Sequence, residues 1–170
     1  MADKLDQQAC RRIVESSFLA GFELAEEPGS TNDDCLLAIR EGRIERHPWL
    51  FVANHQQRGR GRGGNRWWSG PGALTFTVSL QLEDPTQRPL LSLLSAVAVC
   101  QALETTAGCP PLQIKWPNDI YCQGRKLAGI LIESPAIDGT VVLGIGINLN
   151  NSVRQAPPGL EGRAIAVIDI

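Results

Sequence analysis

A glycine- and arginine-rich segment, residues 56–69, carries the densest set of groups that could bind an anion. It reads Gln-Gln-Arg-Gly-Arg-Gly-Arg-Gly-Gly-Asn-Arg-Trp-Trp-Ser. Glycine lets the backbone approach a ligand and present its N–H groups, and arginine offers forked donors that suit phosphate or carboxylate. The formal net charge of the chain is -2, so the segment predicts a local anion site. A solvated loop is the alternative, which the adjacent Trp67 and Trp68 disfavour.

The same segment formally matches a dinucleotide-binding fingerprint. Gly59, Gly61 and Gly64 have the G-x-G-x-x-G spacing, and Glu83 follows at a suitable distance. That fingerprint requires a helix directly after the glycines. Here residues 74–82 alternate apolar and polar side chains, which is typical of a strand with one buried face. The pattern therefore argues against a dinucleotide site.

A second candidate segment is Lys-Trp-Pro-Asn-Asp at residues 115–119. Lys115 ends an apolar strand, where we expect it near the interior edge of a sheet and in need of an anion. Asn118 and Asp119 follow a proline, and turn formation alone explains them as well as ligand binding does. Asp119 could also pair with Lys115 or hold Mg²⁺ through its oxygens.

Two further segments place glycines inside strands. Lys126 enters an apolar strand, and Gly129 within that strand indicates close approach of a ligand or another backbone. Gly144 and Gly146, two residues apart, remove side chains from one face and leave a flat floor for a planar group. A tightly packed sheet crossing is the alternative. Asn148 would offer an amide at the edge of this floor.

These groups suit a reaction in which the enzyme positions its substrates and does not itself supply a side-chain nucleophile. The two histidines, His47 and His55, lie outside every motif, and no Ser-His-Asp set is apparent. Activation of an acid by ATP fits, because the enzyme then positions two anions and stabilises the charge that develops between them.

The elements that must position these residues follow from periodicity. Apolar residues at helical spacing predict an amphipathic helix over 5–18. Ser30 with Asp33 matches a helix N-cap before the apolar residues 36–39, and residues 90–103 predict a buried helix. Asp138-Gly139 predicts a hairpin turn. Without repeats or a linker, the pattern indicates one α+β domain over 1–170. Strands are expected at 22–24, 49–53, 74–82, 112–116, 120–122, 127–133 and 141–149.

Composition limits the class of protein. A chain of 170 residues with 43% hydrophobic and 20% charged residues is ordinary for one globular domain. The absence of a global basic field argues against a nucleic-acid partner. Five scattered cysteines predict reduced, buried thiols in a cytoplasmic protein. The N-terminus lacks the apolar core of a signal peptide, and we expect that no apolar stretch reaches the length of a membrane span.

Five motifs in order resemble the biotin protein ligases of the biotin/lipoate ligase family. The resemblance covers residues 25–150 and uses Ser30-Thr31-Asn32, Gln56-x-x-Gly59-Arg60-Gly61-Arg62, residues 115–119, residues 126–131 and Gly144-x-Gly146-Ile147-Asn148. It implies a mixed, mostly antiparallel sheet flanked by helices, similar to lipoate ligases and class II synthetases. It also implies synthesis of biotinyl-5'-AMP from biotin and ATP with Mg²⁺, followed by transfer of biotin to a lysine of the biotin carboxyl carrier domain of acetyl-CoA carboxylase or a related carboxylase.

The resemblance assigns roles motif by motif. Lys115 would meet the biotin carboxylate and the α-phosphate, and Arg62 would act with it in catalysis from the loop that closes over the substrates. Asp119 is a candidate for Mg²⁺, and homodimer formation stays open. The biotin site would comprise Ser30, Thr31, Asn32, Gln56, Arg60, Gly61, Arg62 and Lys115. The nucleotide site would comprise Arg60, Arg62, Trp67, Lys126 and Asn148.

The sequence also departs from the family pattern. Gly63 and Asn65 stand where the family often has basic residues. Neither an N-terminal DNA-binding domain nor a C-terminal small barrel domain is expected, so the domain looks truncated at its C-terminus. Alternatives to a working ligase are a weakly active or inactive protein that binds biotin or biotinyl-AMP, a lipoyl or octanoyl ligase on the same fold, and an interaction domain that does not use ATP.

Overall fold

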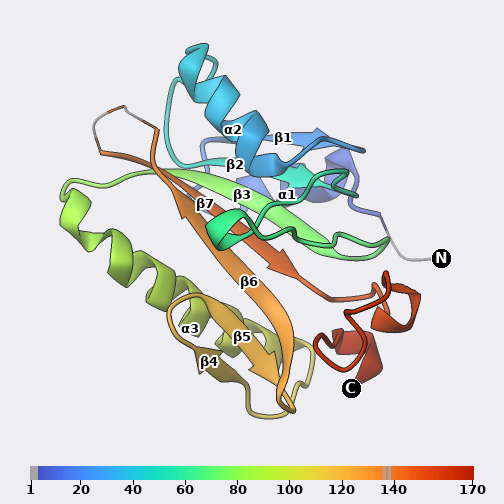
Figure 1. Ribbon diagram of the computed structural model, residues 1–170. Helices are drawn as coiled ribbons and strands as arrows, with labels where there is room; N and C mark the ends of the chain where they lie inside the picture. The colour runs from blue at the N-terminus through green and yellow to red at the C-terminus, as the bar shows by residue number, and fades with distance from the viewer. Residues whose placement is uncertain (1–3, 136, 138) are drawn as a thin grey trace.

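A seven-stranded sheet forms the centre of the molecule (Figure 1). The computed structural model describes residues 4–135, 137 and 139–170. Strand order is β1-β2-β3-β7-β6-β5-β4; β1 and β2 are parallel, and every other neighbouring pair is antiparallel. The expected mixed, mostly antiparallel α+β fold is confirmed. The strands are β1 (Gly21–Ala25), β2 (Trp49–Ala53), β3 (Leu74–Gln81), β4 (Gln113–Lys115), β5 (Asp119–Cys122), β6 (Arg125–Glu133) and β7 (Thr140–Ile147).

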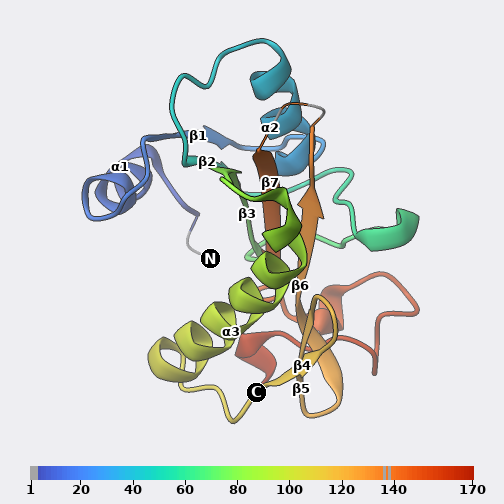
Figure 2. The same cartoon turned by 90° about the vertical axis from the view of Figure 1, so that its left-hand side faces the viewer.

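The α-helices among the described residues cover the two faces of the sheet unequally. They are α1 (Gln7–Glu15), α2 (Thr31–Arg40) and α3 (Arg88–Thr106). In Figure 2, α1 and α3 lie on the opposite side of the sheet from the loop that follows β2. Alternate apolar side chains of β3, β6 and β7 pack toward α3, and Leu50 and Val52 of β2 pack toward α1. Helix α2 packs on the other face against β2, β3 and β7, where it contacts Phe51 and Val142. One half of this second face is left without a covering helix.

Side-chain alternation in β3 explains how one strand serves both faces. Phe76 and Val78 pack into the core on the α1 and α3 side. Thr75 and Thr77 are buried on the opposite side. Since successive side chains of a strand point to opposite faces, the polar half of the pattern is directed toward α2 and the open part of the second face.

Helix α3 differs from the buried helix that its apolar sequence predicts. Ala96, Val99 and Leu103 are buried against the sheet, but Leu90 and Leu94 are 57% and 62% exposed. By length and composition, α3 is also the one helix among the described residues that could cross a membrane, with mean hydropathy 1.3. The expectation that no apolar stretch reaches such a length was therefore wrong. The inner face of α3 belongs to the main core, so α3 is a core helix that also carries a stripe of apolar side chains on its outer face.

Two smaller expectations changed. Ser30 occupies the N-cap position of α2, but its side chain makes no capping hydrogen bond. Helix α1 is shorter than the predicted range 5–18. The predicted turn at Asp138-Gly139 lies partly outside the described residues; β6 and β7, which it would join, pair antiparallel.

The segment after β7 returns to the sheet. Lys126 donates its backbone N–H to Arg163 O and accepts from Ile165 N–H. Val167 N–H donates to Asn148 O. Ile165 is fully buried in the main core. Residues 163–167 are thus hydrogen-bonded to the beginning of β6 and to the residue after β7, at one end of these two neighbouring strands.

Candidate functional site

The register of five strands aligns one row of residues across the open face of the sheet. Thr75 of β3 lies opposite Gly146 of β7, which lies opposite Gly129 of β6. Gly129 in turn lies opposite Asp119 of β5, and Asp119 opposite Lys115 of β4. Directly opposed residues of antiparallel strands project from the same face. The row therefore runs from a hydroxyl, over two glycines, to a carboxylate and an amine.

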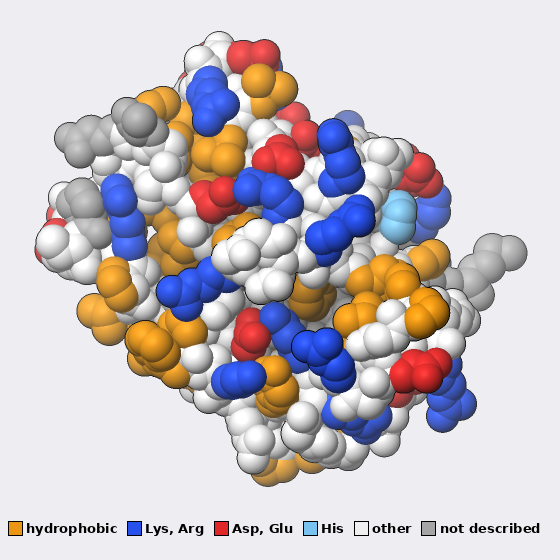
Figure 3. All heavy atoms as spheres, viewed as in Figure 1, with side chains coloured by type: hydrophobic (Ala, Val, Ile, Leu, Met, Phe, Trp, Pro, Cys, Tyr) orange, Lys and Arg blue, Asp and Glu red, His pale blue; other side chains and the backbone are white. Residues whose placement is uncertain are grey.

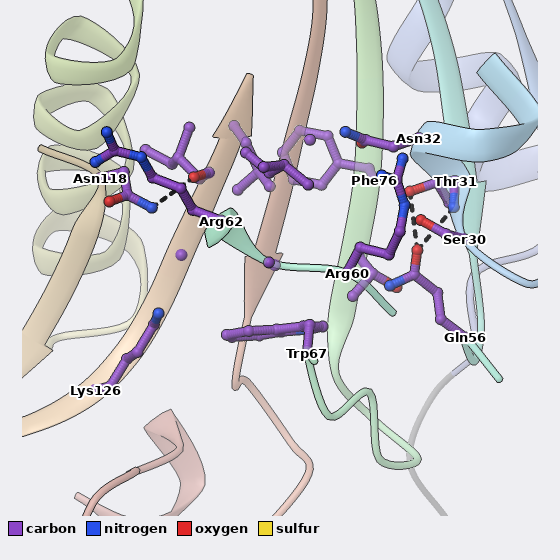
Figure 4. A pocket seen from close by; sticks show the side chains of 18 residues that line it. Ser30, Thr31, Asn32, Gln56, Arg60, Arg62, Trp67, Phe76, Asn118 and Lys126 are labelled. Atoms are coloured by element: carbon purple, nitrogen blue, oxygen red, sulfur yellow. Dashed lines mark hydrogen bonds between the residues drawn. The ribbon is translucent and has the colours of Figure 1, made fainter. Parts of the chain in front are cut away.

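A pocket lies on this face, between the N-terminal end of α2 and strand β6 (Figure 4). The glycine- and arginine-rich segment forms one wall. Figure 3 shows Lys and Arg side chains gathered across the middle of the same face, with acidic side chains between them. The lining residues are Ser30, Thr31, Asn32, Gln56, Arg60, Gly61, Arg62, Trp67, Thr75, Phe76, Asn118, Lys126, Gly129, Ile130, Leu131, Gly144, Ile145 and Gly146.

One end of the pocket is a network of buried neutral side chains. Gln56 Oε1 accepts from the backbone N–H of Thr31 at 2.8 Å and lies 3.1 Å from the Thr31 hydroxyl. Thr77 Oγ1 lies 2.7 Å from Thr31 Oγ1 and 2.6 Å from Asn32 Oδ1. The amide of Asn32 rests directly over Gly144, where a Cβ atom would collide with it. Such a wall suits a neutral ligand group with several hydrogen-bonding atoms.

The arginine segment folds back on itself beside this network. Arg60 and Arg66 form an antiparallel bridge, and Trp67 N–H donates to Gly59 O at 2.9 Å. Arg60 donates two hydrogen bonds, of 2.8 and 2.6 Å, to the carboxylate of Glu133 at the end of β6. This brings the segment against the sheet, as a wall of the pocket.

Trp67 lies on the glycine floor. A Cβ atom at Gly146 would collide with its indole ring, and Lys126 Nζ is 5.9 Å from the ring centroid. The indole N–H is buried and has no hydrogen-bond partner among the described residues. The flat floor predicted from Gly144 and Gly146 therefore holds side chains of the protein itself, an amide on one glycine and an indole on the other.

The opposite end of the pocket is cationic. Lys126 Nζ donates to Asp119 Oδ1 at 2.7 Å and packs beside Gly129. Figure 4 shows Lys126 and Asn118 on the β6 side and the Ser30, Thr31 and Gln56 group on the other, with Trp67 between them. Arg62 reaches the pocket from the segment above. The pocket thus has a neutral polar end, an aromatic middle and a basic end.

Two residues expected in the site lie outside the pocket lining. Lys115 is exposed; its Nζ is 5.2 Å from the centroid of the Tyr121 ring and 3.4 Å from the Tyr121 hydroxyl. It stands on the pocket face, at the far end of the glycine row, instead of buried near an anion as expected. Asn148 is buried, and its Oδ1 accepts from Asn151 at 3.0 Å. The other predicted biotin and nucleotide residues line this pocket.

The titratable groups nearby offer neither a metal cluster nor an activated thiol. Asp119 pairs with Lys126 rather than with Lys115. Among residues 4–135, 137 and 139–170, no three His, Cys, Asp or Glu side chains come together as a metal site. Behind the pocket, burial raises the pKa of the Cys35 thiol to about 12, so this cysteine stays protonated at neutral pH.

Sequence reasoning missed several residues of the site. Glu133 was noted only as the end of a strand, although it contacts both Arg60 and Asn32. Thr75 and Thr77 were recognised only as the polar half of an alternating strand. The signal that could have found them is the pairing of their strands with β7, because it sets Thr75 and Thr77 beside the two glycines.

Comparison with known proteins agrees with this geometry. A model of the Biotin/lipoate A/B protein ligase family matches residues 30–150. The chain is 35% identical to a biotin--[acetyl-CoA-carboxylase] ligase of Mycobacterium tuberculosis, covering 98% of this chain and 62% of that protein. It is 41% identical to a bifunctional ligase/repressor BirA of Bacillus subtilis over 69% of this chain and 38% of that protein. The chain thus spans between 38% and 62% of the length of these two relatives.

Solved structures show the same fold. A biotin protein ligase from Aquifex aeolicus, in complex with biotin and ATP, superposes with a TM-score of 0.70 at 31% identity. The superposition covers 88% of this chain and 60% of that one.

Proposed function

Since this chain belongs to the Biotin/lipoate A/B protein ligase family, we propose that it activates biotin with ATP and transfers it to a lysine of a biotin carboxyl carrier protein. The observation that carries this proposal is the division of one pocket into a neutral polar end and a basic end. The bicyclic ring system of biotin is neutral and rich in hydrogen-bonding atoms, whereas its carboxylate and the phosphates of ATP are anions. The relative from Aquifex aeolicus was solved with both of these ligands.

The neutral end is where we place the ring system of biotin. Thr31, Asn32 and Gln56 are buried and hydrogen-bonded to one another or to neighbouring strands, and Ser30 is buried beside them. Pre-fixed polar groups lose little conformational entropy on binding, which favours affinity for a ligand of matching shape. The indole N–H of Trp67, buried without a partner among the described residues, would find an acceptor in the bound substrates.

The basic end is where we place the reacting groups. A carboxylate oxygen of biotin attacks the α-phosphorus of ATP; the new P–O bond forms as the bond to the bridging oxygen breaks, and pyrophosphate leaves. Arg62 and Lys126 line this end, and Lys115 stands on the same face. Cations there would favour the transition state, in which negative charge builds up around the phosphorus. Mg²⁺ would enter with ATP, because it binds readily through phosphates, water and few carboxylates.

In the second step the ε-amine of a carrier lysine attacks the carbonyl carbon of biotinyl-5'-AMP. An amide bond forms, the amine loses a proton, and AMP leaves. We expect this to occur in the cytoplasm, since all five cysteines are unpaired and buried, as suits a reducing compartment. The carrier domain of acetyl-CoA carboxylase or a related carboxylase is the proposed partner.

Exchange of labelled pyrophosphate into ATP tests the first step. We expect exchange with biotin and none with lipoate or octanoate. Exchange with lipoate alone would move the protein to the lipoate branch of its family. Biotin binding without exchange would leave a biotin-binding protein that does not adenylate. A purified carrier domain, assayed for biotin incorporation, then tests the transfer step separately.

A further inference from the structure

Glu133 lies outside the pocket lining but contacts two of the residues that form it. Its side chain is 24% exposed. It accepts two hydrogen bonds from Arg60, at 2.8 and 2.6 Å, and one from Asn32 Nδ2 at 2.8 Å. These partners come from the arginine segment and from the first turn of α2. A single carboxylate therefore joins three separate parts of the chain around the neutral end of the pocket.

The charge of this carboxylate fixes the orientation of Asn32. An ionised carboxylate can only accept hydrogen bonds, so Asn32 must direct its NH₂ group at Glu133 and its carbonyl oxygen at Thr77. The Thr77 hydroxyl has one proton, and the Asn32 oxygen has none to give. Thr77 therefore donates to Asn32 across their 2.6 Å contact.

The same order continues to the Thr31 hydroxyl, whereas the backbone N–H of Thr31 sets the orientation of Gln56. With its proton given to Asn32, Thr77 can only accept from Thr31 across their 2.7 Å contact. Gln56 Oε1 is already occupied by the backbone N–H of Thr31. Gln56 thus turns its NH₂ group away from Thr31. The wall made by Asn32 and Gln56 then offers amide donors, which suit a carbonyl oxygen such as that of the biotin ureido group.

Arg60 depends on the same carboxylate. Burial alone would lower the pKa of its guanidinium, but the hydrogen bond and charge of Glu133, together with the charge of Asp33, raise it. Asp33 is the more exposed partner, at 52%. A bidentate pair between arginine and carboxylate is geometrically specific as well as strong, so Glu133 anchors the arginine segment to β6 before a ligand arrives.

We propose that Glu133 is a positioning residue for biotin: it anchors Arg60 and orders the hydrogen bonds from Asn32 through Thr77 to the Thr31 hydroxyl, so that the pocket presents the Asn32 amide donor to the ureido carbonyl beside that of Gln56. This inference rests on the proposed function. Glu133 itself touches neither the reacting atoms nor the nucleotide end. Its loss should therefore weaken recognition of the biotin ring more than that of ATP, which Glu133 affects only indirectly, through Arg60 and Arg62 of the anchored segment.

Three variants test the proposal. Glu133→Gln keeps the size but introduces an NH₂ group, which must face either Arg60 or Asn32. Glu133→Asp keeps the acceptor character on a shorter side chain. Asp33→Asn removes the exposed contact of Arg60 and leaves Glu133 in place. The first measurements are calorimetry with biotin, and the KM values for biotin and for ATP in pyrophosphate exchange.

We expect Glu133→Gln to raise the dissociation constant and KM for biotin by about tenfold or more, the usual scale for a disrupted buried hydrogen bond to a charged group. The KM for ATP should rise by a clearly smaller factor. Glu133→Asp should recover part of the loss, and Asp33→Asn should resemble the wild type. Preference for biotin over 2-iminobiotin, which carries an N–H in place of the ureido oxygen, should also fall in Glu133→Gln. Equal increases in both KM values, or an unchanged preference, would overturn the ordering of the hydrogen bonds.

Trypsin cleavage of the ligand-free proteins separates this inference from the proposed function. The arginine segment should be cut faster in Glu133→Gln than in the wild type and Asp33→Asn. An unchanged cutting rate would refute the anchoring of Arg60. If the wild type bound no biotin, the proposed function would fail, and the cutting rates alone would still decide whether Glu133 holds the segment.

Discussion

At the scale of single residues, the site depends on positions where a side chain is absent. Gly144 lies under the Asn32 amide, and Gly146 under the Trp67 indole. Gly129, next in the row, has looser neighbours: a Cβ there would lie 3.2 Å from Lys126 Cε. The end of a lysine side chain can move aside, whereas a ring wedged between a strand and a loop cannot.

These differences predict unequal effects of two matched substitutions. Gly146→Ala should displace Trp67 and weaken biotin binding by about tenfold or more, since overpacking of a fitted site commonly costs about 1–3 kcal/mol. Gly129→Ala should change it by much less. Calorimetric titration of both variants with biotin checks this, and circular dichroism confirms that both are folded. Equal affinities in the two variants would show that Trp67 does not need the bare floor.

A substitution at Lys115 should affect the reaction more than binding, because Lys115 lies at the edge of the site. Lys115→Ala should slow adenylation by about a hundredfold while biotin binding falls far less, since charge grows at the phosphate only in the transition state. Its Nζ now rests near the ring of Tyr121, a contact that a substrate phosphate could readily replace. Pyrophosphate exchange and calorimetry on the same variant provide the comparison. Equal losses in both assays would contradict this role.

At the scale of elements, sequence periodicity was a good guide to the sheet and a poor one to the surroundings of α3. Every predicted strand appears in the structure, because β3 and its neighbours alternate or run apolar in lengths that only strands satisfy. Helix α3 was expected to be buried on all sides, since its sequence is apolar on all sides. Apolar composition cannot reveal that Leu94 faces outward while Leu103 faces the core.

The two faces of α3 should respond differently to truncation. Leu103→Ala removes a side chain from the main core and should lower the free energy of unfolding by about 2–5 kcal/mol. Leu94→Ala, at a position 62% exposed, should lower it by less than about 1 kcal/mol. Urea denaturation of both variants measures the difference. A large loss at Leu94 would mean that this outer stripe is covered in solution.

The site could be anticipated only in part, for a related reason. Motifs identified Ser30, Gln56, Arg60 and Lys126, because these residues stand out by type and spacing. Glu133 could not be identified in this way, because its importance comes from the pairing that places β6 beside α2 and the arginine segment. The displaced position of Lys115 likewise follows from the edge location of β4, which local sequence does not specify.

At the scale of the whole molecule, the segment after β7 connects the site to global stability. Asp169 accepts from Ser152 Oγ at 2.7 Å and from Val153 N–H at 2.9 Å. The residues just before Asp169 form backbone hydrogen bonds with the site: Arg163 and Ile165 with Lys126, and Val167 with Asn148. Loosening this segment should therefore affect both the fold and the basic end of the pocket.

Acid titration should reveal the contribution of Asp169. Burial alone would raise its pKa, but the hydrogen bonds from Ser152 and Val153 lower it overall. A carboxyl group with a lowered pKa adds stability above its unfolded value, about 3.9, and loses it as the pH falls through the folded value. Asp169→Asn should thus be less stable than the wild type near neutral pH, and the difference should shrink below about pH 4. Thermal unfolding at several pH values measures it; a constant difference would exclude this origin.

Trp67 also provides an intrinsic fluorescent probe of the pocket. An indole that lies between bare backbone and the ammonium group of Lys126 has an emission spectrum that depends on the polarity and charge around it. Substrates that enter the pocket replace solvent on the open side of the ring and draw Lys126 toward phosphate. Each arrival and departure would then register as a change in intrinsic fluorescence, so that the kinetics of loading can be followed on the unlabelled protein, with Trp67→Phe as the control for the signal of the other three tryptophans.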